Sequence, residues 1–462
     1  MKQSNTGGIM LIRHFFIEKI AHSSYMLQGN GQCAVIDPAR DISIYLEAAG
    51  NSGLKITSIL ETHLHADFLS GHTDLAEATG AEIIAPGSAH CDFAHIGVKG
   101  GDSFFIEDMK VDVLETPGHT PEHVSYVITD TSRGSEPVGV FCGDTLFVGD
   151  AGRPDLFPGM ARELAGKLFY SLAKLMELPD FCEVWPSHGA GSLCGRAVGA
   201  KYTSTVGYER KYNPVVRIQS MEEFILHQTS NMPQAPDHFQ RCSEINRCGP
   251  LTLIGKPLPP SLSPEEFKDL SERNGTVVVD IRSCDAFSSQ HIPGSINIST
   301  LGNFPTFAGW LLNPDKEILF VAESREQALE AVKELSMVGE HRVAGYLPGG
   351  LFNWAMKGFP GKGFQQIFAE ELRSMLNSSE EFILVDARGP GEYSSGSIPG
   401  AVNIPAPEMR TRFTELQKEK KIVVFCSSGH RSSMGASILA ANGFEKLAHL
   451  SGGIAAWKTL AH

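Results

Sequence analysis

The chain has 462 residues, of which 42% are hydrophobic and 20% are charged, and its formal net charge is −14. Length alone predicts about three domains, and the composition is typical of a soluble globular protein. The negative charge argues against a general nucleic-acid or anionic-membrane binder. No apolar run approaches the ~20 residues of a membrane span. We therefore expect neither a nucleic acid nor a membrane as a partner.

The N-terminal segment and the cysteines both predict a cytoplasmic protein. Residues Met1 to Met10 are polar and Gly-rich and lack the apolar stretch of a secretory signal. The nine cysteines are scattered singly and form no Cys-x-x-Cys pair. This distribution fits reduced thiols rather than a disulfide framework. We expect any special cysteine to be special through its reactivity.

Strands and helices are predicted to alternate through the first part of the chain. Short apolar runs from Phe15 to Asp37 are broken by Gly29-Asn30-Gly31, which predicts a hairpin. A helix is predicted over 41–49, a buried strand over 56–60 and a helix-like stretch over 73–78. The later predicted elements are strands over 83–85, 111–115, 124–128 and 138–142, and a helix over 161–175.

The stretch from Thr62 to Phe68 carries the first candidate site. It places His63, His65 and Asp67 on alternate positions just after a buried strand. Ligand crevices of α/β proteins lie at such strand ends, and imidazole together with carboxylate suits Zn, Fe or Mn. Other predicted strands also end in His or Asp, and they complete the set of candidate ligands with His119, Asp144 and His188.

An internal repeat follows a Pro-rich and polar linker within 231–264. The segment Val277–Arg282 matches Ile383–Arg388, and the segment 291–298 matches 397–404. Each copy has the length of one small α/β domain, so the repeat indicates a duplication. The predicted domains are 10–250, 262–360 and 364–462.

The pattern His-x-His-x-Asp, followed by a later His, Asp and His, resembles that of the metallo-β-lactamase superfamily over about Leu11 to Gly199. The resemblance implies an αββα sandwich with metal at one rim of its two sheets. The sequence departs from the pattern at Phe68, where the family has a histidine for a second metal. Because phenylalanine cannot bind a metal, we expect a centre with one metal.

Within the superfamily, the chain most resembles the persulfide dioxygenases of the ethylmalonic encephalopathy protein type. The resemblance implies one Fe(II) per chain, held by His63, His119 and Asp144 as a 2-His-1-carboxylate triad with open positions. The remaining candidates would orient these ligands, or form the vestige of a second metal site. They are His65, Asp67 and His188.

Two further residues are candidates for substrate binding. Arg153, in Gly152-Arg153-Pro154-Asp155, matches the family's arginine that faces the thiol carrier and could hold a carboxylate or phosphate. A surface ion pair is the alternative role for this arginine. Cys194 follows His188 closely and could relay sulfur or contact the persulfide. Its alternative role is that of a small buried apolar side chain.

The last domain carries a cysteine loop. Cys426 lies between the predicted strand 423–425 and a helix of small residues, where backbone N–H groups and the helix dipole stabilise a thiolate. Arg431 adds positive charge for an anionic sulfur compound. With Gly452-Gly453, the loop resembles the rhodanese family over Ile367 to His462, which implies that Cys426 carries a persulfide. The Cys-x4-Arg spacing is one residue shorter than the Cys-x5-Arg loop of phosphatases.

The middle copy of the repeat lacks this thiol. Ala322 stands at the position that corresponds to Cys426, and Glu323 brings negative charge to the loop. We therefore predict an inactive rhodanese-like domain that packs, spaces or dimerises. Cys284 lies in a different loop and is a weak candidate for a substitute nucleophile.

These parts together predict an enzyme that is both a persulfide dioxygenase and a thiosulfate sulfurtransferase. It would oxidise a low-molecular-weight persulfide with O2 to sulfite and thiol, and it would form or use thiosulfate in sulfide detoxification. Resemblance to such fusions also predicts a homo-oligomer. One alternative is a zinc-dependent thioester hydrolase of the glyoxalase II type with an accessory sulfurtransferase domain. The other is a sulfur-sensing or sulfur-carrier protein.

Overall fold

The computed structural model describes residues 10–460 except 231, 233 and 380, so most of the segment Met1 to Met10 lies outside the described residues. The chain divides into two compact units. The first holds residues up to 256 together with 337–339, and the second holds 257–336 and the residues from 340 onward. Both copies of the repeat lie mainly in the second unit, and the predicted domain boundaries stay predictions. No described helix is long and apolar enough to cross a membrane.

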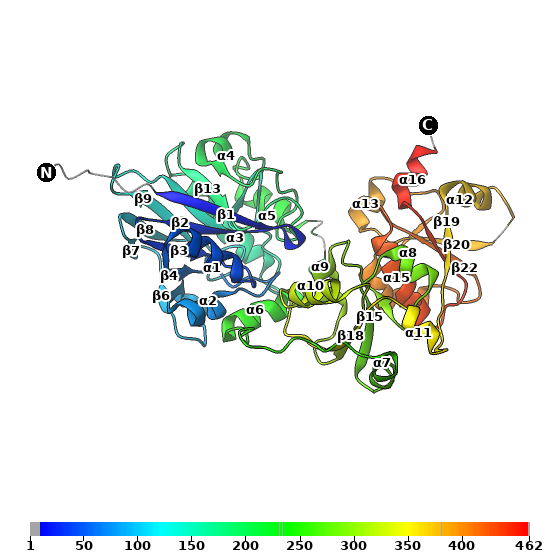
Figure 1. The fold of residues 1–462 in the computed structure, drawn as a ribbon. Helices are drawn as coiled ribbons and strands as arrows, with labels where there is room; N and C mark the ends of the chain where they lie inside the picture. The colour runs from blue at the N-terminus through cyan, green and yellow to red at the C-terminus, as the bar shows by residue number, and fades with distance from the viewer. Residues whose placement is uncertain (1–9, 231, 233, 380, 461–462) are drawn as a thin grey trace. The chain divides into compact units, whose positions relative to one another are not determined.

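Two six-stranded sheets form the centre of the first unit (Figure 1). The strands of the first sheet follow chain order: β1 (Leu11–Ile17), β2 (His22–Gln28), β3 (Gln32–Ile36), β4 (Lys55–Leu60), β5 (Glu82–Pro86) and β6 (Ile96–Val98). Strands β1 to β3 pair antiparallel, and β3 to β6 pair parallel. The predicted hairpin at Gly29-Asn30-Gly31 is confirmed, since it joins β2 to β3.

The second sheet is mostly antiparallel. Its strand order is β14 (Ser204–Thr205), β13 (Glu183–Pro186), β10 (Gly139–Gly143), β9 (Val124–Asp130), β8 (Met109–Glu115) and β7 (Ser103–Ile106). A separate two-stranded ribbon pairs β11 (Leu146–Phe147) with β12 (Asp150–Ala151). The strands predicted over 111–115, 124–128 and 138–142 match β8, β9 and β10 to within two residues.

Helices cover the outer face of each sheet. On the first sheet, Tyr45 of α1 (Ser43–Ser52) and Leu75 of α2 (His72–Thr79) join the apolar cluster of the strands. On the second sheet, Leu168 of α3 (Ala161–Leu175) and Phe224 of α5 (Met221–Thr229) do the same. The unit also contains α4 (Val206–Tyr212), α6 (His238–Cys248) and the 3-10 turns η1 (Glu18–Ile20) and η2 (Gly87–Ala89).

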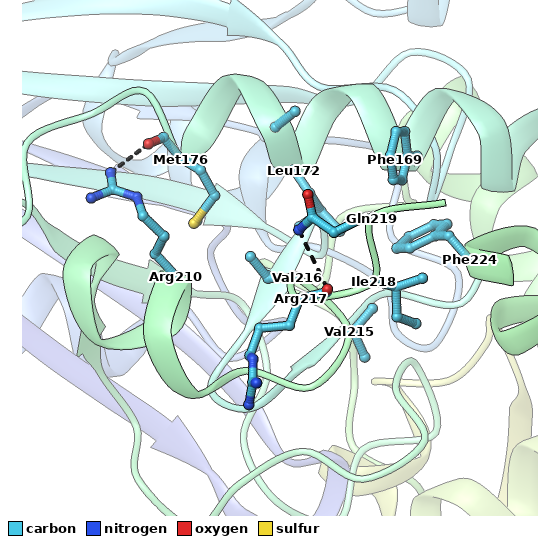
Figure 2. Close-up of a pocket in the computed structure, with 11 residues that line it drawn as sticks. Phe169, Leu172, Met176, Arg210, Val215, Val216, Arg217, Ile218, Gln219 and Phe224 are labelled. Atoms are coloured by element: carbon cyan, nitrogen blue, oxygen red, sulfur yellow. Dashed lines mark hydrogen bonds between the residues drawn. The ribbon is translucent and has the colours of Figure 1, made fainter. Parts of the chain in front are cut away.

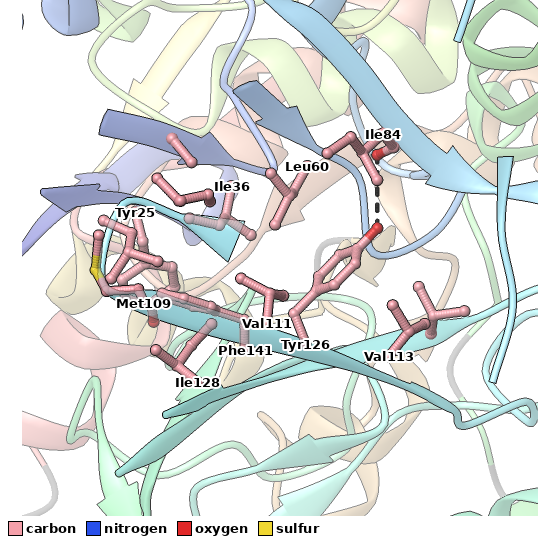
Figure 3. Close-up of a cluster of buried hydrophobic side chains, with 14 of the residues drawn as sticks. Tyr25, Ile36, Leu60, Ile84, Met109, Val111, Val113, Tyr126, Ile128 and Phe141 are labelled. Atoms are coloured by element: carbon pink, nitrogen blue, oxygen red, sulfur yellow. Dashed lines mark hydrogen bonds between the residues drawn. The ribbon is translucent and has the colours of Figure 1, made fainter. Parts of the chain in front are cut away.

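The two sheets face each other across an apolar core (Figure 3). Tyr25 and Ile36 from the first sheet pack with Val111 and Phe141 from the second. The hydroxyl of Tyr126 donates to the carbonyl of Glu61 at 2.8 Å, which satisfies a buried polar group between the layers. Helices outside, sheets inside and a shared core make up the predicted αββα sandwich, which is confirmed.

The middle copy of the repeat is a parallel sheet with helices around it. The strand order is β16 (Ile296–Asn297), β15 (Thr276–Asp280), β17 (Glu317–Val321) and β18 (Arg342–Leu347). Its helices are α7 (Pro264–Ser271), α8 (Cys284–Ser289), α9 (Phe304–Leu311), α10 (Arg325–Leu335) and α11 (Phe352–Met356).

The last copy repeats this plan with one more strand. The strand order is β19 (Gln365–Ile367), β23 (Leu447–Leu450), β22 (Lys421–Phe425), β20 (Phe382–Asp386) and β21 (Val402–Asn403), all parallel. Its helices are α12 (Ala369–Leu376), α13 (Pro390–Ser394), α14 (Met409–Arg412), α15 (His430–Ala441) and α16 (Gly453–Thr459), with 3-10 turns η3 (Ala406–Glu408) and η4 (Phe413–Glu415). Cys426 follows the end of the central strand β22 directly.

Candidate metal centre and cysteine loop

Three of the predicted ligands meet at one rim of the sandwich. His63 follows β4, His119 follows β8 and Asp144 follows β10, and all three side chains are buried. Nε2 of His119 lies 3.3 Å from Oδ2 of Asp144, and Nε2 of His63 lies 3.9 Å from the same oxygen. The chain therefore brings two imidazole nitrogens and one carboxylate oxygen to a common point.

A hydrogen-bond chain determines which nitrogen of His63 carries the proton. The hydroxyl of Thr62 donates to Oδ2 of Asp37 at 2.8 Å, because a carboxylate can only accept. The hydroxyl oxygen is then left to accept from Nδ1–H of His63, at 2.9 Å. Nε2 of His63 consequently carries a free lone pair, which is the form that binds a metal.

The other two ligands are oriented in a similar way. Nδ1–H of His119 donates to the backbone carbonyl of Arg153 at 2.9 Å. Nδ1–H of His188 donates to Oδ1 of Asp144 at 2.7 Å. The remaining atoms, Nε2 of His63, Nε2 of His119 and Oδ2 of Asp144, are buried and have no hydrogen-bond partner among the residues that the structure describes. Three unpartnered buried atoms of this kind fit a first-row metal, since leaving them empty would cost desolvation free energy.

Burial and neighbouring charges shift the pKa values in the direction that metal binding requires. Burial lowers the pKa of His63 well below its usual value, and it also lowers that of His119. Burial alone would raise the pKa of Asp144, but the nearby His188 and His119 outweigh it and lower the pKa. The histidines are therefore neutral and the aspartate is ionised near neutral pH.

His65 lies in a different group from these ligands. Its Nε2 is 3.3 Å from Asp37 and 3.6 Å from Glu61, within a second buried cluster. Burial raises the pKa of Glu61 to about 8. This position is compatible with the predicted supporting role of His65, since Asp37 also holds Thr62 and through it His63.

Asp67, His188 and Cys194 form a third buried group. Nε2 of His188 lies 2.8 Å from Oδ2 of Asp67, while Nδ1 is bonded to Asp144, so both ring nitrogens have carboxylate partners. Burial opposes the charged ring, yet the two carboxylates raise the pKa of His188 well above its usual value. A second metal at this place would have to break the bond between His188 and Asp67.

Phe68 fills the position of the missing ligand with an aromatic ring. Its side chain is fully buried, and its ring centroid lies 4.1 Å from that of His22 and 4.5 Å from that of His65. The site thus has apolar packing where a second metal would need a donor atom. This packing and the engaged nitrogens of His188 both favour one metal.

Arg153 forms an ion pair, the alternative role given for it, although its own side chain is buried rather than at the surface. Its side chain is only 1% exposed, and Nε and Nη2 donate to the two carboxylate oxygens of Asp155 at 2.7 and 2.8 Å. A third bond from Nη1 reaches the carbonyl of Leu193. The guanidinium therefore forms an ion pair with the half-buried Asp155, and the backbone carbonyl of Arg153 accepts from His119 of the candidate metal centre.

Cys194 lies behind the wall of a cavity. A cavity of about 460 Å³ is lined by Leu64 and Ala66, which alternate with the motif histidines, and by Phe239 among others. Cys194 packs in the same apolar cluster as Ala66 and Phe239. Burial raises the pKa of its thiol well above the usual value. The thiol is thus protonated and close to both the cavity wall and Asp67.

A second cavity, of about 280 Å³, lies elsewhere in the first unit (Figure 2). It is lined by apolar side chains such as Phe169 and Phe224, together with Arg210 and Arg217. Arg210 is bonded to carbonyl oxygens, including that of Met176. Unlike the cavity of about 460 Å³, it is not lined by Leu64 or Ala66, the residues that alternate with the motif histidines.

Sequence reasoning missed several residues of the site. Asp37 accepts hydrogen bonds from the backbone N–H and hydroxyl of Thr62 and from Ser187, and it adopts a left-handed conformation with φ of 49°. Such strain at a non-glycine residue is frequent at functional sites. Nε2 of His123 accepts from the N–H of Asp144 at 3.0 Å. The sequence offered one signal for each residue. Asp37 stands at the end of a predicted strand just before Pro38, and His123 is a second histidine four residues after His119.

The cysteine loop of the last copy has the features that the sequence predicts. Sγ of Cys426 accepts from the N–H of Gly429 at 3.1 Å and lies 3.6 Å from the hydroxyl of Ser432. Gly429 has φ of 128°, which side-chain-bearing residues rarely adopt. A Cβ at Gly453 would lie 2.3 Å from the carbonyl oxygen of Cys426, so only glycine allows this close approach.

Arg431 is paired within the loop. Its Nη2 donates to Oε1 of Glu392 at 2.9 Å and to the hydroxyl of Ser427 at 2.8 Å. Burial works against ionisation of Glu392, but Arg431 outweighs it and lowers the pKa of Glu392 to about 2. Arg431 therefore orders the loop through Glu392 and Ser427.

The middle copy has no thiol at the equivalent position. Val321 pairs with Asp280 as Phe425 pairs with Asp386, so Ala322 and Cys426 occupy the same place after the central strand. The alignment made from the sequence is confirmed. The loop that follows is one residue shorter, because α10 begins at Arg325 whereas α15 begins at His430.

The comparisons with known proteins agree with this fold. Residues 18–188 match the family described as the metallo-beta-lactamase superfamily, and residues 263–357 and 368–460 each match the rhodanese-like domain. A solved metallo-beta-lactamase from Staphylococcus aureus subsp. aureus COL is 34% identical, with a TM-score of 0.67. The match covers 75% of this chain and 99% of that one.

Two further similarities concern the first domain. A hydroxyacylglutathione hydrolase of Pseudomonas entomophila (strain L48) is 28% identical over 217 residues, which are 47% of this chain and 80% of that protein. The solved structure of ETHE1 from Myxococcus xanthus is 28% identical with a TM-score of 0.44, covering 52% of this chain and 98% of that one. On the family matches and the Staphylococcus aureus structure, the chain belongs to the metallo-beta-lactamase superfamily and carries two rhodanese-like domains after the metallo-beta-lactamase domain.

Proposed function

We propose that the chain is an iron-dependent persulfide dioxygenase joined to a sulfurtransferase that acts in sulfide detoxification. The first domain would oxidise a low-molecular-weight persulfide to sulfite and thiol, and the last domain would form or use thiosulfate. The observation that carries the proposal is the donor set. Two imidazole nitrogens and one carboxylate oxygen are left unpartnered, and Phe68 excludes a second-metal ligand.

The residues around the centre hold and shield these donors. Thr62 and the carbonyl of Arg153 keep both histidines in the tautomer that exposes Nε2. His188 holds one oxygen of Asp144 and leaves the other free. His63, His119 and Asp144 would hold iron(II), which when bound would supply the activation of O2. Phe68, packed against His65, offers no donor atom for a second metal.

The cavity of about 460 Å³ beside Leu64 and Ala66 is the proposed place for the body of the persulfide. Its apolar residues, such as Leu156 and Phe239, suit the stem of a small thiol, and the charged Glu122, Glu244 and Arg247 also line it. Cys194 lies behind this wall and next to Asp67, which supports contact with the reacting sulfur. Arg153 receives no such role, because a carboxylate of the carrier would have to displace Asp155.

Sulfur transfer at Cys426 follows from its loop. The thiolate attacks the outer sulfur of a persulfide, R–S–SH, and releases the thiol RSH, so that Cys426 carries the sulfane sulfur as Cys–S–S⁻. Sulfite then attacks this outer sulfur, forms thiosulfate and regenerates the thiolate. The N–H of Gly429 stabilises negative charge on Sγ during both steps.

The second candidate is a zinc-dependent thioester hydrolase of the glyoxalase II type with an accessory sulfurtransferase domain. The name of the Pseudomonas entomophila relative favours it. The same three free atoms could also hold zinc. In that arrangement both histidines of the His-x-His pair would be ligands, and a second metal would need His188. The geometry around Phe68 and His188 supports the dioxygenase instead.

Metal analysis of matched variants separates the two candidates. We expect the purified protein to contain about one iron per chain. His119→Ala should lose most of this iron, while His65→Ala should keep it, because His65 faces Asp37 rather than the donor set. Zinc in place of iron, loss of metal in His65→Ala and hydrolysis of a glutathione thioester would together support the hydrolase.

A further inference from the structure

The middle copy, although it lacks the reactive cysteine, covers the helix that follows the cysteine loop of the last copy. Helix α15 contacts its own strands β22 and β23, and it also contacts β16 and α8 of the middle copy. Every residue from Ser432 to Leu439 is buried. A helix whose sides are all buried needs a partner on its outer face. Here that partner is the inactive copy.

Buried polar contacts fix this packing. The hydroxyl of Ser433 donates to Oδ1 of Asn297 at 2.7 Å, and the N–H of Asn297 donates to the hydroxyl of Ser437 at 3.0 Å. All three residues are buried. Since unpaired buried polar groups are costly, these bonds specify one register between α15 and the middle copy.

One contact reaches the cysteine loop itself. His430, which lies four residues after Cys426 and just before Arg431, has its Nδ1 at 3.5 Å from Sγ of Cys284 in the middle copy. The ring also lies against Gly302, where a Cβ would approach its Cγ to 3.2 Å. Two residues of the middle copy thus hold the imidazole in one orientation.

The protonation states leave the Cys284 thiol able to donate in this contact. Burial raises the pKa of Cys284 to about 12, so it is a thiol, and burial lowers the pKa of His430, so the ring is neutral. The S–H of Cys284 can then donate to Nδ1, which places the ring proton on Nε2. Among the described residues, Nε2 of His430 has no hydrogen-bond partner.

We propose that the middle copy completes the sulfur-transfer site: Cys284 is a positioning residue that turns the Nε2–H of His430 toward anionic sulfur compounds at the Cys426 loop. This inference rests on the proposed sulfur transfer by Cys426. In this arrangement a residue of the middle copy acts on the sulfur-transfer site. His430 would add a hydrogen-bond donor for the anionic sulfur compound, since Arg431 is already paired with Glu392.

The test measures sulfur transfer from thiosulfate to cyanide in the full chain. Cys284→Ala should lower kcat/KM for thiosulfate about tenfold, mainly through KM, because one hydrogen bond that orients the donor is lost. Cys284→Ser should recover most of the loss, since its hydroxyl can donate to Nδ1. Ser289→Ala, at the exposed end of the same helix α8, is the matched control and should be unchanged.

A double variant tests whether Cys284 acts through His430. Adding Cys284→Ala to His430→Gln should cause no further loss, whereas a further loss would show a merely structural effect and overturn the proposal. Wild-type activity in Cys284→Ala would overturn it as well. Side-chain ¹⁵N spectra, with the His430 signal assigned by its absence in His430→Gln, should show the Nε2–H tautomer in the wild type. A different tautomer would contradict the proposal whatever the activity.

The same experiments distinguish a failure of the proposed function. If Cys426→Ala still transfers sulfur, Cys426 is not the residue that carries the sulfur, and the proposed role of Cys284 is wrong as well. If Cys426→Ala is inactive while Cys284→Ala matches the wild type, only the role of Cys284 is wrong.

Discussion

In both rhodanese-like copies, a buried arginine folds back on the aspartate that ends an inner strand, β15 in the middle copy and β20 in the last. Nε of Arg282 donates to Oδ1 of Asp280 at 2.9 Å, and Nε of Arg388 donates to Oδ1 of Asp386 at 3.0 Å. Each arginine also donates from Nη2 to a backbone carbonyl at 2.8 Å. The two copies therefore keep the same internal support for the strand end, whether or not the site is reactive.

The copies differ at the loop after the central strand. Ala322 replaces Cys426, and the loop before the helix is one residue shorter. A backbone N–H still closes each loop: that of Gly350 donates to the carbonyl of Ala322, and that of Ile454 to the carbonyl of Cys426. The hydrogen bonds that stabilise the fold are therefore kept in the middle copy, although this copy lacks the cysteine and has a shorter loop after the central strand. The fold does not depend on the residues that would carry the chemistry.

The largest expected effect comes from making the last copy resemble the middle copy, which lacks the cysteine. Cys426→Ala should lower sulfur transfer by at least about a thousandfold, because the nucleophile is lost. O2 consumption with a persulfide should be unchanged, since the metal donors lie in the other unit. The check is a pair of assays, thiocyanate formation and oxygen uptake, with Cys248→Ala, which removes an exposed cysteine, as the control. Residual transfer within tenfold of the wild type would mean that another residue carries the sulfur.

A smaller effect is expected from the asparagine that each copy uses to bridge two carbonyls. Nδ2 of Asn403 donates to the carbonyls of Asp386 and Arg388, and Asn297 makes the equivalent pair of bonds. Asn403→Ala should destabilise the second unit by about 1–3 kcal/mol. Asn297→Ala should cost more, because the buried hydroxyl of Ser433 also loses its acceptor. Urea unfolding of the full chain measures the midpoint concentration for each variant. Equal midpoints would contradict the expectation that Asn297→Ala is the more destabilising change.

The ion pair of Glu392 and Arg431, which belongs to the active loop, predicts a pH dependence. The folded pKa of Glu392, about 2, lies below its value in the unfolded chain. Its contribution is therefore present above the unfolded pKa and is lost as pH falls through the folded one. Because the Glu392 side chain is 42% exposed, the contribution is at most about 1 kcal/mol.

Glu392→Gln exposes this dependence directly. The difference in Tm between the wild type and the variant should be constant from about pH 6 to 8 and should shrink as pH falls below about 4. A difference that grows toward acid would show the opposite linkage. Glu415→Gln, which removes a surface carboxylate paired with Arg412, is the control.

The smallest expected effect is that of restoring the thiol to the middle copy. Ala322→Cys in a Cys426→Ala background should give no sulfur transfer, because the shorter loop lacks a residue equivalent to Gly429 and Glu323 adds negative charge. Thiocyanate formation and alkylation by iodoacetamide both report on the new thiol. Transfer at a tenth of the wild-type rate would show that the loop length does not matter.

Local motifs were sufficient to predict much of this molecule. The strand-end residues His63, His119 and Asp144 and the loop of Cys426 are recognisable because each depends on a few neighbouring residues. The alternation of apolar runs likewise predicted α3 and the β2–β3 hairpin, since both follow from periodicity and turn chemistry.

Contacts between distant segments could not be predicted in this way. The sequence does not show that Asp37 holds Thr62, that Asp155 occupies the guanidinium of Arg153, or that Cys284 meets His430. These pairs exist only after the sheets and copies have packed. The predicted carrier-binding role of Arg153 stays a prediction, and the structure shows the partner that the sequence could not: the buried guanidinium pairs with the half-buried Asp155.

The central claim is that the three free donors of the first domain support oxygen chemistry on a persulfide. The most direct measurement is oxygen uptake by the iron-loaded full chain with glutathione persulfide, together with sulfite formation. The account predicts about one O2 consumed and one sulfite formed per persulfide in Cys426→Ala, which cannot divert sulfite to thiosulfate, and none in His119→Ala. No oxygen uptake by protein that holds iron at full occupancy would contradict it.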